Sequence, residues 1–362
     1  MGVQVRERRV LEVWQGGRWR TARAGGRLRP LQRLIVPAVL AGTLAALVLA
    51  VDPHEFVASI ARLDLRLVAV IIGLGLAFYL VQGVRWHLLL ADVGARLRLP
   101  DSVLLNTAGQ AITAILPLGD LTRAVFASQA SRTEFGKVAA TVTVQELAYT
   151  LVLVLSATPV MLELHLGLGT VLAVVGAIAG ILAILTVPPV FRLVHRVVGR
   201  VPVLRGARRQ LDELHEQTAV LLRRPGTLLW SVLDVGRAAV AITVLWLVVI
   251  ALHPGALGWW QAAFVLALSY VGGAISLIPG GAGANEASMV GLLVLLHVDP
   301  GTAAAASLLH RLFMTGLATL LGWAAYTVAR RRFELGSLLA VRPPASQPAR
   351  GEPVALEVRQ AA

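Results

Sequence analysis

Long apolar runs, each close to the length of a membrane-spanning helix, constrain this chain more than any other feature. A helix needs about 20 apolar residues to cross the hydrocarbon of a bilayer. A mean hydropathy of +0.74 is too apolar for a soluble globule of this size. The sequence therefore predicts an all-α polytopic membrane protein. The full spans are expected at residues 34–51, 67–90, 138–161, 167–190, 227–252 and 303–329.

Two further apolar regions are interrupted by proline and glycine, and each interruption is followed by an acid. Residues 103–116 precede the sequence Pro-Leu-Gly-Asp, whereas residues 260–278 and 284–297 flank Pro-Gly-Gly-Ala-Gly. Short apolar runs of about 10–14 residues are typical of re-entrant segments. Broken backbone at membrane depth is tolerated around a buried or wet cavity. We therefore predict two re-entrant helical hairpins, and paired interruptions of this kind point to a transporter binding site.

The distribution of arginine predicts the topology. Loops rich in Arg and Lys face the cytoplasm. The Arg-rich segments are 91–137, 192–226 and 330–332, whereas 52–66, 162–166 and 253–259 together hold only Arg62 and Arg66. Six spans and two hairpins place every Arg-rich segment inside, with both termini cytoplasmic and the hairpins entering from opposite sides as an inverted repeat. If 260–278 and 284–297 both cross, the pattern fits eight spans and one hairpin equally well.

The ends of the chain differ in composition from its middle. Residues 1–33 hold nine Arg and two Gly-Gly pairs, which predicts a disordered basic cytoplasmic arm. Residues 34–332 form the expected transmembrane domain, and 333–362, rich in Pro, form a disordered cytoplasmic tail. Within the domain, 205–224 has the pattern of an amphipathic surface helix. The net charge of +13 fits loops that face anionic lipid in the plasma (inner) membrane and does not indicate nucleic-acid binding.

Charged residues inside the apolar regions are the strongest functional signal, because each costs several kcal/mol at the bilayer centre unless it is paired or hydrated. Glu146 and Arg311 lie at similar depths in their spans, counted from opposite sides. They form either a gated ion pair beside an anionic headgroup or a static pair between two helices. The charges inside the apolar regions are Arg85, Glu146, Asp234, Arg237 and Arg311, with Asp120, Arg123 and Glu286 at the breaks.

Several of these charges also have a purely structural explanation. Asp234 and Arg237 are three residues apart on one helix and can pair locally. Arg85 precedes Trp86 near the end of a span, so snorkelling explains it as well as phosphate binding does. The two acids after the breaks can cap helices, although helix N-termini also bind phosphate.

Missing motifs argue against an enzyme. The chain has no Cys, which excludes disulfides and thiol chemistry. The one lysine, Lys137, is followed by Val138, so no Walker A loop is present. Neither H-E-x-x-H nor G-x-S-x-G occurs. We expect no cofactor and no metal site.

The motifs resemble those of the lysylphosphatidylglycerol synthase transmembrane-domain family, also called flippase-like domain proteins. The most specific element is Pro-Gly-Gly-x-Gly-x-x-Glu from Pro279 to Glu286 with a downstream Arg; the others include Arg85-Trp86, Gln145-Glu146 and His310-Arg311. The resemblance implies movement of aminoacylated or polyprenyl-linked lipids between leaflets. It does not include the soluble aminoacyltransferase domain, so we expect no lipid synthesis. Leu147 stands where the family often has Arg, which leaves Arg311 without a symmetric counterpart.

The sequence therefore predicts a flippase-like protein that moves an anionic or aminoacylated lipid between leaflets. An ion-coupled small-solute transporter and a non-transporting accessory subunit of a lipid- or glycan-synthesis enzyme are the alternatives. The expected partners are membrane lipids with anionic headgroups. The predicted lipid-binding residues are Arg85, Pro117, Gly119, Asp120, Arg123, Glu146, Pro279, Gly280, Gly281, Gly283, Glu286, His310 and Arg311.

Overall fold

The computed structural model describes residues 64–113, 119–164, 208–276 and 283–333, together with 12–15, 18–21 and scattered positions within 169–193 and at 281 and 335. The chain divides into two compact units, Met1–Ala46 and Leu47–Ala362. In the first unit, β1 (Glu12–Gln15) pairs antiparallel with β2 (Arg18–Thr21), with Trp14 opposite Trp19. Their Trp, Val and Thr residues favour strands. Both strands lie within residues 1–33, and the disordered basic arm predicted there stays a prediction.

Four stretches of helix in the second unit are long and apolar enough to cross a membrane. They are α3 (Leu65–Asp92), α6 (Phe135–Glu163), the pair α10 (Pro225–Trp230) and α11 (Val232–Leu252), and the series α14 (Pro300–Arg311), η3 (Leu312–Gly316) and α15 (Leu317–Phe333). Helices long and apolar enough to cross a membrane are therefore present at the spans predicted at 67–90, 138–161, 227–252 and 303–329. The predicted span at 34–51 and most of that at 167–190 lie outside the described residues. The prediction of an all-α membrane domain is confirmed.

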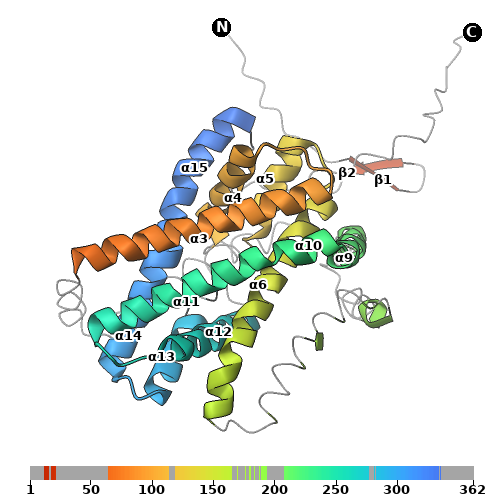
Figure 1. Cartoon of the computed structure of the whole chain (residues 1–362). Coiled ribbons are helices and arrows are strands. Elements are labelled where there is room, and N and C mark those ends of the chain that lie inside the picture. The colour runs from red at the N-terminus through yellow and green to blue at the C-terminus, as the bar shows by residue number, and fades with distance from the viewer. Residues whose placement is uncertain are drawn as a thin grey trace, which may run out of the picture. The chain divides into compact units, whose positions relative to one another are not determined.

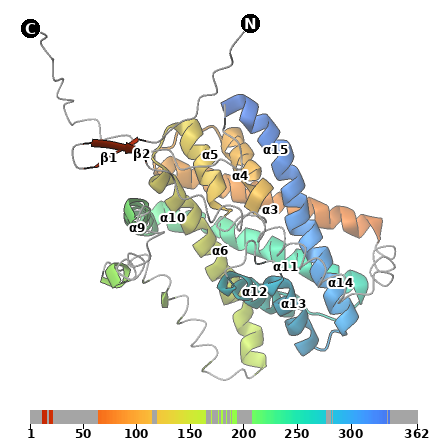
Figure 2. The same cartoon turned by 180° about the vertical axis from the view of Figure 1, so that it is seen from behind.

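Shorter helices border both Pro/Gly interruptions. Helices α4 (Leu99–Thr113) and α5 (Leu121–Ser131) lie on either side of the first, and α12 (Trp259–Ile275) and α13 (Ala284–Leu295) on either side of the second. Within each pair the two helices pack against one another, and Figure 2 shows α12 and α13 side by side beside α6. The expected breaks therefore separate packed helices. Their re-entrant character and inverted symmetry stay predictions.

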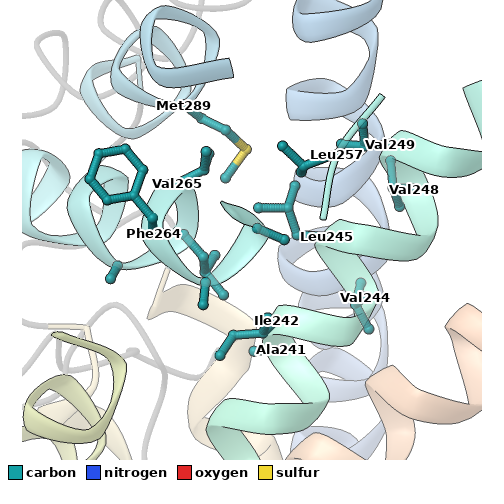
Figure 3. Packing of buried hydrophobic residues seen from close by; sticks show 14 of the residues in the cluster. Ala241, Ile242, Val244, Leu245, Val248, Val249, Leu257, Phe264, Val265 and Met289 are labelled. Atoms are coloured by element: carbon teal, nitrogen blue, oxygen red, sulfur yellow. The ribbon is translucent and has the colours of Figure 1, made fainter. Parts of the chain in front are cut away.

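Buried apolar side chains join the helices around α11. Ile242, Leu245 and Val249 of α11 are fully buried and meet Phe264 of α12 and Met289 of α13 in one cluster, which Figure 3 shows from close by. Helix α11 also packs along α3, as seen in Figure 1. The amphipathic helix predicted at 205–224 is present as α9 (Arg208–Leu222), which packs on α6. This core fixes α3, α6, α11 and α12 relative to one another.

Glycine allows the two backbones of α15 and α4 to touch. A Cβ atom added at Gly322 would lie 2.3 Å from the Ala111 nitrogen and 2.8 Å from its Cα. Both contacts are to backbone, which cannot rotate away as a side chain could. Small residues are how membrane helices approach one another this closely.

Replacing Gly322 with alanine should therefore lower the free energy of unfolding by about 1–3 kcal/mol, the usual effect of overpacking. Gly73 of α3 is the matched control, because nothing lies within 4 Å of an added Cβ there. Thermal unfolding of the purified protein in detergent measures both. Equal unfolding temperatures for Gly322→Ala and Gly73→Ala would contradict the backbone contact.

Candidate functional site

Glu146 of α6 is the centre of a buried polar cluster. Its carboxylate accepts a hydrogen bond from Arg123 Nη2 of α5 at 2.7 Å and lies 3.3 Å from Arg237 Nη2 of α11. Gln82 Nε2 of α3 donates to the same carboxylate at 3.3 Å. The Glu146 side chain keeps 21% of its surface exposed, whereas Arg123 is fully buried. One acid is thus shared by two arginines, so one positive charge in the cluster has no ion-pair partner of its own.

Arg123 is held in place by neutral acceptors as well. Its Nη1 donates to Asn106 Oδ1 at 2.6 Å and to Gln145 Oε1 at 3.0 Å. A Cβ added at Gly109 of α4 would lie 2.6 Å from the Arg123 Cβ, so glycine there lets α5 lie this close to α4. We call the following residues the Glu146 cluster: Gln82, Asn106, Arg123, Gln145, Glu146 and Arg237.

Gln82 was missed by the sequence reasoning, although it organises much of the cluster. Its side-chain oxygen accepts from Asn106 Nδ2 at 3.2 Å, and its backbone oxygen accepts from Gln145 Nε2 at 2.8 Å. The signal that could have found it is an uncharged polar residue in the middle of an apolar span. Such residues hydrogen-bond across helices in membranes.

Arg237 is the least satisfied charge in the cluster. Its guanidinium lies over two aromatic rings, 4.1 Å from the centre of Tyr149 and 4.7 Å from that of Phe78. The residue is 3% exposed, and its Nε and Nη1 atoms are buried without hydrogen-bond partners. Buried N–H donors are normally paired. Arg237 therefore has unused donors that an anion could accept.

Arg85 and Asp234 form a second pair, between α3 and α11. Arg85 Nε lies 3.1 Å from Asp234 Oδ2, and both side chains are fully buried. Arg85 Nη2 also donates to the Thr227 backbone oxygen at 3.2 Å, beside the junction of α10 and α11. The local pair expected between Asp234 and Arg237 is wrong, because α3 brings a guanidinium from a distant part of the chain. Nor does Arg85 snorkel: its charge is neutralised inside the protein.

Glu286 and Arg311 form the third pair, at the second break. Arg311 Nη1 of α14 donates to Glu286 Oε1 of α13. The other Glu286 oxygen accepts from the Gly283 backbone N–H at 2.5 Å, which satisfies one free donor at the start of α13. Gly283 has a φ of 84°, a conformation that glycine adopts without strain. Glu286 thus both caps its helix and neutralises Arg311.

The pairs at the two breaks correspond to one another with the charges exchanged. At the first break the helix after the interruption carries the base, Arg123, and the following span carries the acid, Glu146. At the second break the helix after the interruption carries the acid, Glu286, and the following span carries the base, Arg311. The partners are 23 residues apart in the first pair and 25 in the second. The predicted Glu146–Arg311 pair, whether gated or static, is therefore wrong, since Glu146 pairs with Arg123 and Arg237, and Arg311 pairs with Glu286.

A π-helix follows Arg311 directly. The segment η3 spans Leu312–Gly316, and Tyr79 of α3 donates its hydroxyl to the Met314 backbone oxygen at 3.2 Å. Single π turns inside longer helices are frequent at functional sites. His310 is half-buried, and its Nε2 has no hydrogen-bond partner. The adjacent residues His310 and Arg311, both predicted to bind lipid, thus lie directly before an irregular turn that α3 contacts.

Asp120 is the N-cap residue of α5, yet its side chain makes no capping hydrogen bond. Its carboxyl group is instead within electrostatic range of Glu146, Arg123 and Arg237. The capping explanation of Asp120 is therefore wrong, and the residue belongs beside the Glu146 cluster. Gly119 before it is buried. The predicted site residues Pro117, Pro279 and Gly280 lie outside the described residues.

At the second break, Gly281 contacts α12. It has a φ of 62°, and an added Cβ there would lie 3.1 Å from the Gly273 Cα. Within the described ranges, no group of three or more His, Asp or Glu side chains could hold a metal ion. The arrangement offers charge, hydrogen bonds and aromatic faces, which suit binding of an anion.

The family model described as the lysylphosphatidylglycerol synthase TM region matches residues 34–322. The match includes both breaks and every residue of the Glu146 cluster. Comparison with curated proteins finds no match for this chain.

Proposed function

We propose, since this chain belongs to the family of the lysylphosphatidylglycerol synthase TM region, that it moves a lipid with an anionic headgroup between the two leaflets of a membrane. The family is one of membrane proteins related to lipids. The Glu146 cluster supports the more specific proposal that this chain transports an anionic or aminoacylated phospholipid or a polyprenyl-linked lipid.

One observation supports lipid transport most directly: the Glu146 carboxylate is shared by two buried arginines, Arg123 and Arg237. Charges at membrane depth are expensive unless they are neutralised. An anionic headgroup would neutralise the surplus positive charge and accept from the unused Nε and Nη1 of Arg237. Guanidinium groups bind phosphate through paired, charge-assisted hydrogen bonds. The cluster therefore has the charge and the donors that a lipid phosphate needs.

The partly exposed Glu146 is the part of the cluster from which a headgroup would enter, while its acyl chains stay among the membrane helices. Movement of the helices beside the two breaks would expose the cluster to each leaflet in turn. In this proposal the hairpins enter from opposite sides of the plasma membrane and both termini are cytoplasmic. The protein itself catalyses no covalent reaction.

Reconstitution into vesicles tests the proposal. Vesicles that contain the purified full-length chain and a fluorescent phosphatidylglycerol should expose label from both leaflets to an added quencher. Protein-free vesicles should expose the outer leaflet alone. A fluorescent phosphatidylcholine, whose headgroup has no net charge, is the matched control and should move more slowly.

Equal quenching in loaded and protein-free vesicles, over several anionic lipids, would exclude lipid transport. An ion-coupled small-solute transporter and an accessory subunit both predict that result. Uptake of a soluble anion by the same vesicles would then separate these two alternatives.

A further inference from the structure

The charges at membrane depth can be listed for the described helices and for the breaks between them. The predicted spans and breaks that the described ranges omit wholly or largely, 34–51, 114–118, 167–190 and 277–282, contain no Asp, Glu, Lys, Arg or His in the sequence. Apart from charges that pair with an exposed partner, such as the buried Asp101 of α4 with Arg332 of α15, the buried or half-buried charges of the described membrane helices are four arginines and four acids. They are Arg85, Arg123, Arg237, Arg311, Asp120, Glu146, Asp234 and Glu286.

Three of the four acids are used in ion pairs, and the fourth is not. Asp234 neutralises Arg85, Glu286 neutralises Arg311, and Glu146 serves both remaining arginines. Among the described residues, no cation lies within ion-pair distance of Asp120. These four arginines and four acids together are therefore neutral when Asp120 is ionised, and they carry one positive charge when Asp120 is protonated.

Asp120 lies at the start of α5, three residues before Arg123, and this spacing puts the two residues on the same side of the helix, beside the Glu146 cluster. It is half-buried and makes no cap hydrogen bond. Its ionisable or hydrogen-bonding neighbours come from its own helix and from every helix around the cluster. They are Arg123 of α5, Thr113 of α4, Glu146 of α6, Arg237 of α11, Tyr79 of α3 and Tyr270 of α12.

A headgroup phosphate bound to Arg237 would compete with the Asp120 carboxylate for the same surplus charge. Two anions beside one unbalanced cation repel one another, and the low-dielectric surroundings make that repulsion strong. Protonation of Asp120 removes it. Beside the Glu146 carboxylate, the cluster can therefore hold one further negative charge at a time, supplied either by the Asp120 carboxylate or by the lipid.

We propose that Asp120 takes up one proton when a lipid with a singly charged phosphodiester headgroup binds at Arg237, and releases it when the lipid leaves. This inference rests on the function proposed above and names its substrate class and its coupling. The proton comes from water on the side of entry, adds to an Asp120 carboxylate oxygen, and returns to water on the side of exit. Lipid anion and proton together carry no net charge, so a pH gradient drives the movement and the membrane potential does not oppose it. A diphosphate lipid would bring more negative charge than one proton offsets.

Calorimetry of short-chain phosphatidylglycerol binding to the purified full-length chain, in neutral detergent, tests this coupling. Titrations at one pH in two buffers of different ionisation heat give the number of protons taken up, which should be one per lipid. Affinity should weaken by up to about tenfold per pH unit once the free protein has lost the Asp120 proton, because ligand and proton bind together. Asp120→Asn, which resembles the protonated acid, should bind without proton uptake and with little pH dependence.

Glu134→Gln is the matched control, because Glu134 is an exposed acid paired with Lys137, and it should behave as the unsubstituted protein does. Binding without proton uptake, or unchanged uptake in Asp120→Asn, would overturn the coupling and leave lipid transport standing. Failure to bind at any pH would count against the proposed function itself. If Asp120→Asn does not fold, Asp120→Glu should still take up one proton per lipid. In that case, proton uptake by the unsubstituted protein remains the test of the coupling.

Discussion

Replacing Asp234 with alanine should lower the free energy of unfolding by about 3–5 kcal/mol, the usual effect of removing one partner from a buried ion pair. Asp234 and Arg85 are both fully buried, so the remaining guanidinium would have no counterion and no access to water. Thermal unfolding in detergent is the measurement. Asp92→Ala is the control, because its pair with Arg224 is partly exposed and 3.7 Å long.

The double variant Arg85→Met with Asp234→Leu should recover most of that loss, since apolar residues of similar size often replace buried pairs without destabilisation. It should also keep lipid binding, because the pair lies outside the Glu146 cluster. A single Asp234 variant as stable as the Asp92 variant would show that Arg85 does not depend on this acid. Loss of lipid binding in a stable double variant would show that Arg85 or Asp234 takes part in the site.

Replacing Arg237 with glutamine should weaken the binding of short-chain phosphatidylglycerol by roughly 30-fold or more, as expected when a buried charge partner worth about 2–5 kcal/mol is removed. Glutamine keeps hydrogen-bonding capacity but loses the surplus charge and the stacking between Phe78 and Tyr149. Lipid movement in vesicles should fall in parallel.

Arg237→Lys separates charge from shape in this prediction. Lysine keeps the positive charge but lacks the planar fork that binds phosphate through two hydrogen bonds, so its affinity should lie between those of the glutamine variant and the unsubstituted protein. Arg223→Gln, at an exposed position after α9, is the control. A folded Arg237→Gln protein with unchanged affinity would show that the headgroup binds elsewhere.

Length and apolar content made four spans predictable, because a long uninterrupted apolar helix has few alternatives to a membrane. Proline and glycine marked the breaks for a similar reason, since they end helices locally. The paired strands β1 and β2 were not expected, because charge and glycine content dominated that part of the sequence. Local composition was enough to predict the spans and the breaks. The strands β1 and β2 depend on pairing between two segments, which composition does not show.

The charged residues were predictable as a set, but their partners were not. Asp234 has a local candidate three residues away in Arg237, and the structure instead pairs it with Arg85, 149 residues distant in sequence. Which helices pack together decides that choice, and periodicity within one helix does not contain the information. Gln82 was missed for a related reason, because its importance comes from Asn106, Gln145 and Glu146 on other helices.

The backbone contact between Gly322 and Ala111 has a consequence for motion. Two helices whose backbones touch cannot slide past one another without a clash, so we expect α4 and α15 to behave as one rigid body. The π turn at Leu312–Gly316 is the point where this body joins α14, and it lies one residue beyond Arg311. A rotation about that turn would tilt α4, and with it Asn106, relative to the helix that carries Arg311. The irregular turn would then act as the hinge that links the two breaks.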